Sequence, residues 1–168
     1  MKAALHMAIV ALLVANSASA TPAESDAEGA TQWVRALARQ DRDHIVSSTR
    51  VPFVFRTTGG DRSCEGWVRS KKALSAWVTC VAKREDFRSL NALLGAEGVD
   101  VVSGWASAGQ IKADDMALKI AGRHGWSQWR LVSVTHLWTT MSFRLLDRSA
   151  GGNFLVGAMI MDIRNSHD

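Results

Sequence analysis

The strand-rich C-terminal third of the chain constrains the fold more than any other feature. It holds two segments rich in apolar and β-branched residues, "LVSVTHL" (131–137) and "MSFRLLD" (141–147), and a third, "FLVGAMIMDI" (154–163). The turn-rich "DRSAGGN" between the last two predicts an antiparallel hairpin. No Gly or Asn separates the first two, which leaves residues 131–146 as either one bent strand or two strands broken near Trp138. A sheet must therefore form one layer of the fold.

Helices are predicted in the preceding half. Thr31 can cap a helix that runs through Gln40, and Ser70 can cap another over Lys71–Ala82. The apolar residues of the second helix recur at helical spacing and form one stripe: Leu74, Trp77, Val78 and Val81. Each helix therefore has one face to bury against another element.

Shorter elements complete the pattern. "REDFRSLNALLG" (84–95) and "DMALKIAG" (115–122) read as short helices, and "VPFVFRT" (51–57) as one early strand. Helices come first and most strands come last, which is typical of the α+β class. The sequence predicts N-terminal helices packed on one side of an antiparallel sheet of about four strands.

Two stretches resemble the nuclear-transport-factor-two-like superfamily, also called cystatin-like or SnoaL-like. "WVRALARQDRDHIVSSTRVPFVFRT" (33–57) is similar to the family's opening, and "MSFRLLDRSAGGNFLVGAMIMDI" (141–163) to its closing strands. The resemblance implies a strongly curved sheet with a cone-shaped pocket beneath it. It also implies varied activities, among them isomerases, cyclases and dehydratases. The chain has no Tyr, which excludes the Tyr-plus-Asp oxyanion arrangement of the ketosteroid-isomerase branch.

Cys64 and Cys80 are the only two cysteines. Zinc sites usually take four ligands with closely paired cysteines, and a redox motif has only two residues between its cysteines. Neither pattern fits, and we expect no metal and no cofactor. An isolated pair in an exported protein predicts one structural disulfide.

The first residues predict export. Residues 1–20 combine Lys2, a short apolar run over 3–15 and the small-x-small sequence Ala18-Ser19-Ala20, as in a signal peptide cleaved after Ala20. We expect a periplasmic or secreted protein without a membrane span in the mature chain. The acidic segment 21–30 is expected to be a flexible lead, and residues 31–165 a single domain.

The chain carries a formal net charge of +4, and its basic excess lies in the first half of the mature chain. A basic surface attracts anionic partners. The basic residues of that half are scattered over several predicted elements, without a dense cluster that interleaves aromatic residues. This pattern favours an ordinary solvated surface, and no specific nucleic-acid partner is expected.

A register argument gives one candidate catalytic pair. If Asp147 pairs with Asn153 and the strand runs on unbroken, Trp138 faces Asp162, and His136 lies diagonal to that carboxylate. A His136–Asp162 couple is a candidate general base, and the Trp138 indole beside it is a candidate ligand contact that would wall the site. The alternative is a half-solvated sheet face with ordinary polar groups. Trp126 and Trp129, in "GWSQW", are candidates for a ligand-stacking platform or for core anchors.

Three functions follow from these features. The first is non-catalytic binding of a small apolar ligand or a protein partner. The second is a small acid–base enzyme, isomerase-like or hydrolase-like, that uses the His/Asp pair. The third is binding of an anionic envelope polymer through a basic face. The sequence does not decide the ligand, the partner or the oligomeric state.

Overall fold

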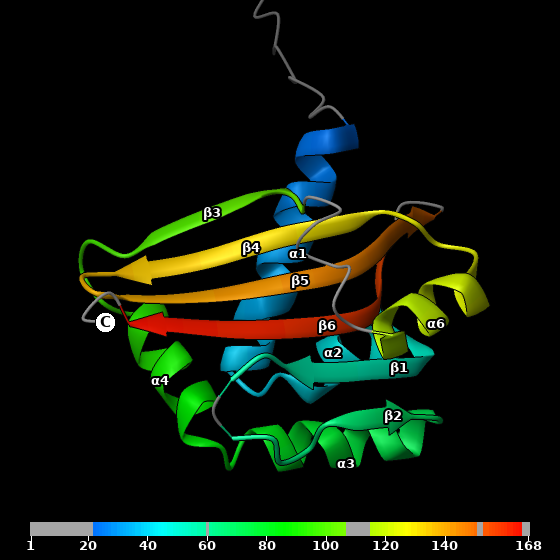
Figure 1. The fold of residues 1–168 in the computed structure, drawn as a ribbon. Coiled ribbons are helices and arrows are strands. Elements are labelled where there is room, and N and C mark those ends of the chain that lie inside the picture. The colour runs from blue at the N-terminus through cyan, green and yellow to red at the C-terminus, as the bar shows by residue number, and fades with distance from the viewer. Residues whose placement is uncertain (1–21, 60, 107–114, 151–152, 166–168) are drawn as a thin grey trace, which may run out of the picture.

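A six-stranded sheet forms the centre of the computed structural model, which describes residues 22–59, 61–106, 115–150 and 153–165 (Figure 1). The strands in chain order are β1 (Thr49–Thr57), β2 (Gly66–Val68), β3 (Asp100–Trp105), β4 (Trp129–His136), β5 (Thr139–Ala150) and β6 (Asn153–Asn165). Their spatial order is β2-β1-β6-β5-β4-β3. The signal peptide expected in residues 1–20 lies outside the described residues.

The sheet is mixed, which corrects the prediction of an antiparallel sheet of about four strands. All neighbouring strands pair antiparallel except β1 and β6, which pair in parallel. No turn links β1 to β6, because nearly the whole domain lies between them in sequence, and local sequence therefore carries no signal for their relative direction. The short strand β2, which pairs along the edge of β1, was also not predicted.

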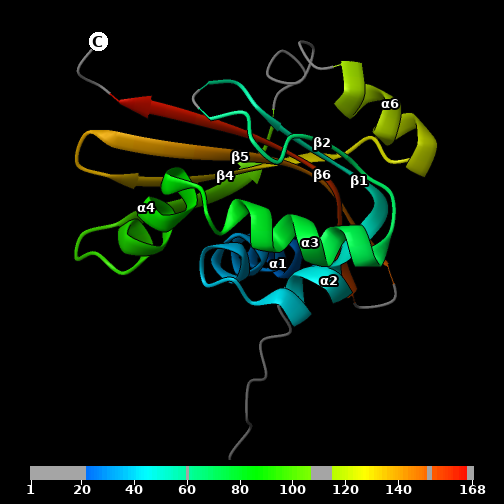
Figure 2. The same ribbon diagram turned by 90° about the horizontal axis from the view of Figure 1, so that it is seen from below.

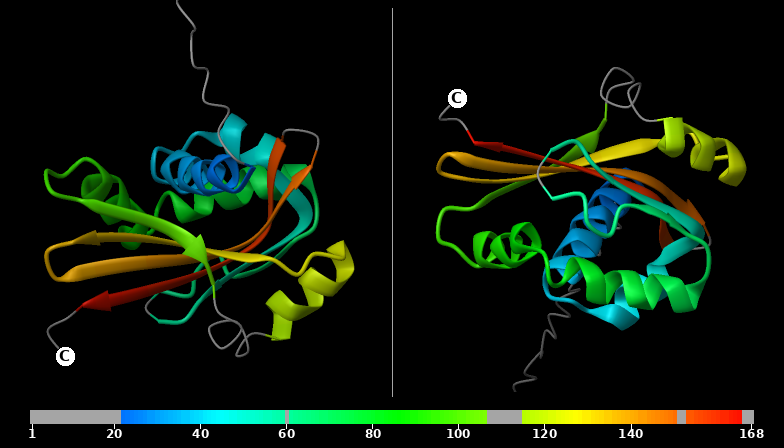
Figure 3. Two further views of the ribbon diagram at one scale, coloured as in Figure 1. Left: turned by 90° about the horizontal axis from the view of Figure 1, so that it is seen from above. Right: turned by 60° about the horizontal axis from the view of Figure 1, so that its bottom comes forward.

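The helices lie in two layers. Four of them cover one face of the sheet: α1 (Pro22–Ala38), α2 (Arg42–Ser48), α3 (Lys71–Val81) and α4 (Glu85–Leu94). The helix α6 (Asp115–His124) lies on the opposite face, at one end of the sheet (Figures 2 and 3). We call the first face inner and the second outer. The α+β class and the helix layer predicted from the sequence are confirmed.

Aromatic side chains dominate the core under the inner face. Phe53 contacts Trp77 edge-on with their ring centroids 4.9 Å apart, and Phe55 contacts Trp77 at 5.5 Å. The Trp33 indole is fully buried and donates a hydrogen bond to Thr49 Oγ1 at 3.1 Å. The predicted stripe of α3 is buried throughout, and Ser70 caps this helix by accepting from the Ala73 amide.

The helix α1 begins at Pro22, so the predicted start at Thr31 is wrong. The Thr31 hydroxyl donates to the Ala27 carbonyl one turn earlier, as a residue inside a helix does. Residues 22–30, expected as a flexible lead, form the first turns of this helix. A Cβ at Gly29 would lie 2.7 Å from Phe154 Cγ, which shows how closely this part of α1 approaches β6.

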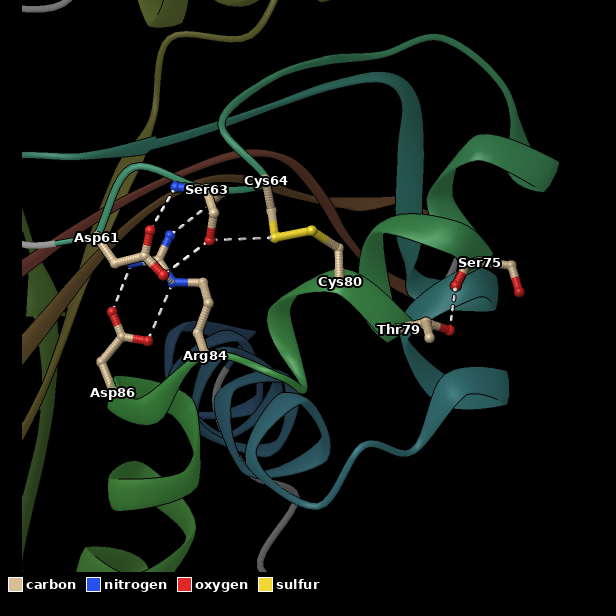
Figure 4. Close-up of a disulfide and its surroundings, with 8 residues drawn as sticks. All are labelled: Asp61, Ser63, Cys64, Ser75, Thr79, Cys80, Arg84 and Asp86. Carbon is tan, nitrogen blue, oxygen red and sulfur yellow. Dashed lines mark hydrogen bonds and ion pairs between the residues drawn. A yellow bond between two sulfur atoms is a disulfide. The ribbon is translucent and has the colours of Figure 1, made fainter.

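The predicted disulfide is confirmed. Cys64, in the β1–β2 connection, is bonded to Cys80 in the last turn of α3, with the Cα atoms 5.9 Å apart (Figure 4). The bond ties the β1–β2 loop to the C-terminal end of α3. Of the described helices, none is long and apolar enough to cross a membrane.

Residues 131–146 form two strands. His136 pairs with Thr139, and Leu137 and Trp138 connect β4 to β5. Leu137 has a φ of 51°, in the left-handed region that favours glycine at this position of a two-residue hairpin. The turn therefore lacks the Gly or Asn that would reveal it in the sequence.

The contact between Gly29 and Phe154 gives a test of the start of α1. Gly29→Ala should lower the free energy of unfolding by about 1–2 kcal/mol, because the cost of overpacking exceeds the gain in helix propensity. Gly122→Ala is the matched control: its Cβ meets nothing within 4 Å in α6, and it should raise stability by up to about 1 kcal/mol. Urea denaturation measures both. Equal stabilisation by the two substitutions would show that α1 does not lie against Phe154 at Gly29.

Candidate functional site

A pocket of ≈ 820 Å³ lies between α4 and the inner face of the sheet, where β4 and β6 end and β5 begins. Figure 2 shows α4 beneath this end of the sheet. The lining residues come from the β1–β2 loop, from α4 and its C-terminal end, and from the three strands: Asp61, Glu85, Asp86, Ser89, Ala92, Leu93, Ala96, His136, Thr139, Met141 and Ile163.

The spacing of the α4 residues explains the opening. Ser89, Ala92 and Leu93 recur at intervals of three and four residues and share one face of α4, and Ala96 lies just past the C-terminal end of this helix. Phe87 and Leu90 lie on another face and are buried in the core. Since three of the four pocket-facing residues have small side chains, α4 packs on the sheet at one side and leaves space at the other.

Strand register supplies the opposite wall. Met141 pairs with Ile163 on β6, and Thr139 pairs with His136 across the hairpin. Side chains two residues apart on a strand share a face, so Thr139, Met141 and their partners all point to the inner face. Leu93, Met141 and Ile163 make an apolar floor. His136 and Thr139 make a polar rim at the sheet side.

The α4 end of the pocket is organised by Arg84, whose side chain is 1% exposed. Its Nε and Nη2 donate to the two Asp86 carboxylate oxygens at 3.1 and 2.5 Å, and Nη1 donates to the Ser63 carbonyl at 2.8 Å (Figure 4). The guanidinium also lies over the rings of Phe55 and Phe87, 5.2 and 5.5 Å from their centroids. One buried cation therefore joins the disulfide loop, the start of α4 and the core.

Asp61 is the second carboxylate near this cation. The Ser63 amide donates to its Oδ1 at 2.7 Å and the Ser63 hydroxyl to its Oδ2 at 2.8 Å, and Arg84 Nε lies 3.8 Å from Oδ2. These hydrogen bonds, helped by the Arg84 charge, hold the pKa of Asp61 below its ordinary value although partial desolvation opposes them. Asp61 is thus an ionised partner of Arg84 at neutral pH.

The structure does not bring His136 and Asp162 together. Asp162 pairs with Ser142, whereas His136 pairs with Thr139, which in turn pairs with Asn165. Thr139 and Ser142 are three positions apart on β5 and therefore point to opposite faces, so His136 points to the inner face and Asp162 to the outer face. The predicted couple is therefore not formed, and Asp162 does not orient the His136 imidazole as the acid–base hypothesis requires.

The predicted register was wrong for two physical reasons. The hairpin is tighter than expected, because β5 runs on to Ala150, which pairs with Asn153, and Asp147 lies opposite Val156. A bulge between Leu146 and Asp147 then shifts the pairing again. Asp162 is held elsewhere, since it accepts hydrogen bonds from Thr58 Oγ1 at 2.8 Å and Arg164 Nε at 3.0 Å.

Asp162 is a structural carboxylate in this position. Burial by itself raises the pKa of Asp162, but the hydrogen bonds from Thr58 and Arg164 and the positive charges of Arg164 and Arg144 outweigh it, and the pKa lies below its ordinary value. A carboxylate that stays ionised and is already paired is a poor proton acceptor at neutral pH.

The three tryptophans proposed as ligand contacts lie in different places. Trp129 is 5% exposed and belongs to the outer-face core under α6. Trp126 packs on the same core, 5.0 Å from the His124 ring, and a Cβ at Gly157 would touch its indole at 3.1 Å. Neither forms an open platform. Trp138 is 61% exposed in the β4–β5 turn, beside the pocket-lining Thr139.

Sequence reasoning missed the α4 face and Arg84. The i, i+3, i+4, i+7 recurrence of Ser89, Ala92, Leu93 and Ala96 was present as a signal. Small residues at this spacing also occur on ordinary solvated helix faces, so the pattern becomes informative only when it faces a sheet. Among the described residues, no group of three or more His, Cys, Asp or Glu side chains is placed to hold a metal ion.

No protein-family model matches the chain, and no curated protein matches it in sequence. Solved structures match it in fold. A ketosteroid isomerase-like protein from Erwinia carotovora atroseptica is 15% identical with a TM-score of 0.43, over 83% of this chain and 94% of that chain. An LEH-like epoxide hydrolase of M. tuberculosis is 12% identical, with a TM-score of 0.30, over 83% and 82% of the two chains.

A domain of unknown function with a cystatin-like fold, from Nostoc punctiforme, is 8% identical with a TM-score of 0.35, over 85% of this chain and 78% of that chain. Similarity at this level concerns the fold alone. The function is therefore argued from the pocket and not from these proteins.

Proposed function

We propose that this domain binds a small, uncharged and mainly apolar molecule in the pocket between α4 and the sheet. The observation that carries the proposal is the combination of an apolar floor with polar groups at two ends of one cavity. Small-molecule sites are typically concave, mostly apolar and about 300–1,000 Å³ in volume. The pocket of ≈ 820 Å³ falls within this range.

The lining supports an apolar ligand body. Leu93, Met141 and Ile163 are half-buried or buried, and their apolar surface faces the cavity. Covering such surface is favourable by about 25 cal/mol for each Å² removed from water. His136 and Thr139 at the sheet side can fix one polar end of a ligand by hydrogen bonding.

The charges at the rim argue against an anionic ligand. Three carboxylates lie at the α4 end of the pocket: Glu85, Asp86 and Asp61. The buried Arg84 guanidinium neutralises part of their negative charge, because it pairs with Asp86 and lies near Asp61. Within the described part of the chain, Glu85 makes no ion pair. A ligand carboxylate or phosphate would meet negative charge here, since the side chain of Arg84 is buried and already bonded. Neutral molecules with a hydrogen-bond donor fit better.

Filling the pocket gives the direct test. N-phenylnaphthylamine is an uncharged apolar probe whose fluorescence rises when it leaves water. Ala92→Trp places an indole in the pocket and should raise the dissociation constant for the probe about tenfold or more, a loss of roughly 1.4 kcal/mol. Ala76→Trp, on the exposed side of α3, is the matched control and should bind as the unsubstituted protein does.

Circular dichroism and urea denaturation establish that both variants fold. If Ala92→Trp and Ala76→Trp bind the probe equally well, the ligand site is elsewhere. If the unsubstituted protein does not bind the probe at all, the pocket does not accept apolar molecules and the proposal fails.

We also propose that the chain is exported. The signal-like residues 1–20 and the Cys64–Cys80 disulfide support this, because structural disulfides persist in oxidising compartments. The intact mass of protein collected outside the cytoplasm should correspond to a chain that begins at Thr21, without alkylation by a thiol reagent before reduction. A chain that retains residues 1–20 and two reactive thiols would contradict this proposal.

A further inference from the structure

Two small pockets beside α6 form a concave surface whose polar side chains are nearly all cationic. One, of ≈ 300 Å³, is lined by Trp67, Arg69, Lys119 and Arg123. The other, of ≈ 250 Å³, is lined by Arg50, Arg123, His124, Trp126, Arg148 and Leu155. They share Arg123. We call the two together the basic cleft. Among the residues that the structure describes, no carboxylate lines either pocket.

The fold gathers these residues from separate elements. Arg50 lies near the start of β1, Arg69 directly follows β2, and Arg148 lies near the end of β5. Lys119 and Arg123 are one turn apart on α6. Arg50 and Arg148 come to the same pocket because β1 and β5 lie on either side of β6. Thr49 on β1 pairs with Val156 of β6, and Arg148 on β5 pairs with the adjacent Leu155. Scattered positions in the sequence thus become one charged surface.

Contacts with a ring and with a backbone carbonyl orient two of the basic groups. The Arg123 guanidinium lies 5.7 Å from the centre of the Trp67 ring, and His124 Nε2 donates to the Pro52 carbonyl at 2.8 Å. Burial lowers the pKa of His124, the bond to Pro52 opposes this, and the charges of Arg50 and Arg123 lower it further. Among the described residues, neither of these arginines forms an ion pair with a carboxylate.

We propose that the basic cleft binds an acidic glycan, through carboxylate or sulfate groups held by arginines in both pockets. Guanidinium groups bind such oxyanions by paired, charge-assisted hydrogen bonds. Arg123 lies in both pockets and can contact two successive anionic groups of one chain. The site is separate from the pocket under α4, since α6 and α4 lie at opposite ends of the sheet and on opposite faces (Figures 1 and 2).

The indoles favour a glycan over a nucleic acid. Single-stranded nucleic acids bind by stacking bases on open aromatic faces. Here the Trp67 ring lies between the Arg123 guanidinium and the outer-face core, and Trp126 packs on His124 and on the same core. Neither ring offers a stacking platform. Glycan recognition through anionic groups needs none, and the proposed export places the chain where such polymers occur.

Titration with a heparin-derived octasaccharide at low ionic strength tests the proposal. Arg123→Ala should weaken binding about fivefold or more, because it removes a charge-assisted contact from both pockets. The double variant Arg50→Ala/Arg148→Ala should weaken binding about tenfold or more, which corresponds to about 1.4 kcal/mol of binding free energy. Arg88→Ala removes the same charge from the exposed side of α4 and should change affinity less than about twofold. Binding should weaken as salt is added.

Three outcomes would overturn the proposal. Equal losses from Arg88→Ala and Arg123→Ala would show diffuse attraction to net charge. Absence of binding at low ionic strength would show that the cleft holds no anionic polymer. A single-stranded oligonucleotide that binds more tightly than the octasaccharide, with the same dependence on Arg123, would replace the glycan with a nucleic acid. Binding of N-phenylnaphthylamine should be unchanged in Arg123→Ala, which separates this site from the α4 pocket.

Discussion

The buried Arg84 guanidinium is the interaction on which the pocket depends. It lies at the N-terminal boundary of α4 and connects Asp86, the Ser63 carbonyl and the rings of Phe55 and Phe87. Burying a cation costs several kilocalories per mole, which only well-oriented partners offset. The bidentate carboxylate, the carbonyl and the two aromatic faces provide them.

This contact fixes the rotation of α4. Phe87 is held in the core beside Arg84, and Leu90 follows one turn later, so the face carrying Ser89 and Ala92 must turn toward the cavity. The Cys64–Cys80 disulfide also fixes the β1–β2 loop that Arg84 binds, because it holds the residue next to Ser63 against the end of α3. The pocket is therefore a consequence of how α4 is anchored at its first turn.

The two proposed sites lie on different faces of the sheet. The inner face meets α4 over an apolar floor, whereas the outer face meets α6 beside a group of cations. Alternation along each strand separates them, since neighbouring residues point to opposite faces. His136 and Asp162 illustrate this separation: both lie near the same end of the sheet, yet they serve different faces.

Local features were predictable from the sequence. The Ser70 cap, the buried stripe of α3 and the Cys64–Cys80 bond depend on neighbours within one helix or on the count of cysteines, and all three are confirmed. The α+β class follows from the order of the elements. These features need no knowledge of which distant segments meet.

Features that depend on distant contacts were not predictable. The parallel pairing of β1 with β6 has no local signal, and the bulge near Asp147 altered every cross-strand partner beyond it. The turn at Leu137 uses a left-handed residue other than Gly or Asn. The candidate site suffered most, because the prediction ran residues 131–146 as one unbroken strand and so placed His136 on the same face as Asp162. The turn at Leu137 and Trp138 instead pairs His136 with Thr139, on the opposite face.

Methyl NMR on the complex with N-phenylnaphthylamine tests the central claim most directly, that the space beneath α4 is a ligand site. With Met and Ile methyl groups labelled, the probe should give intermolecular NOEs to Met141 and Ile163, which line the pocket. It should give none to Met116, which packs with the outer-face core under α6. NOEs to Met116, or the absence of NOEs to Met141 and Ile163 in a saturated complex, would contradict the account.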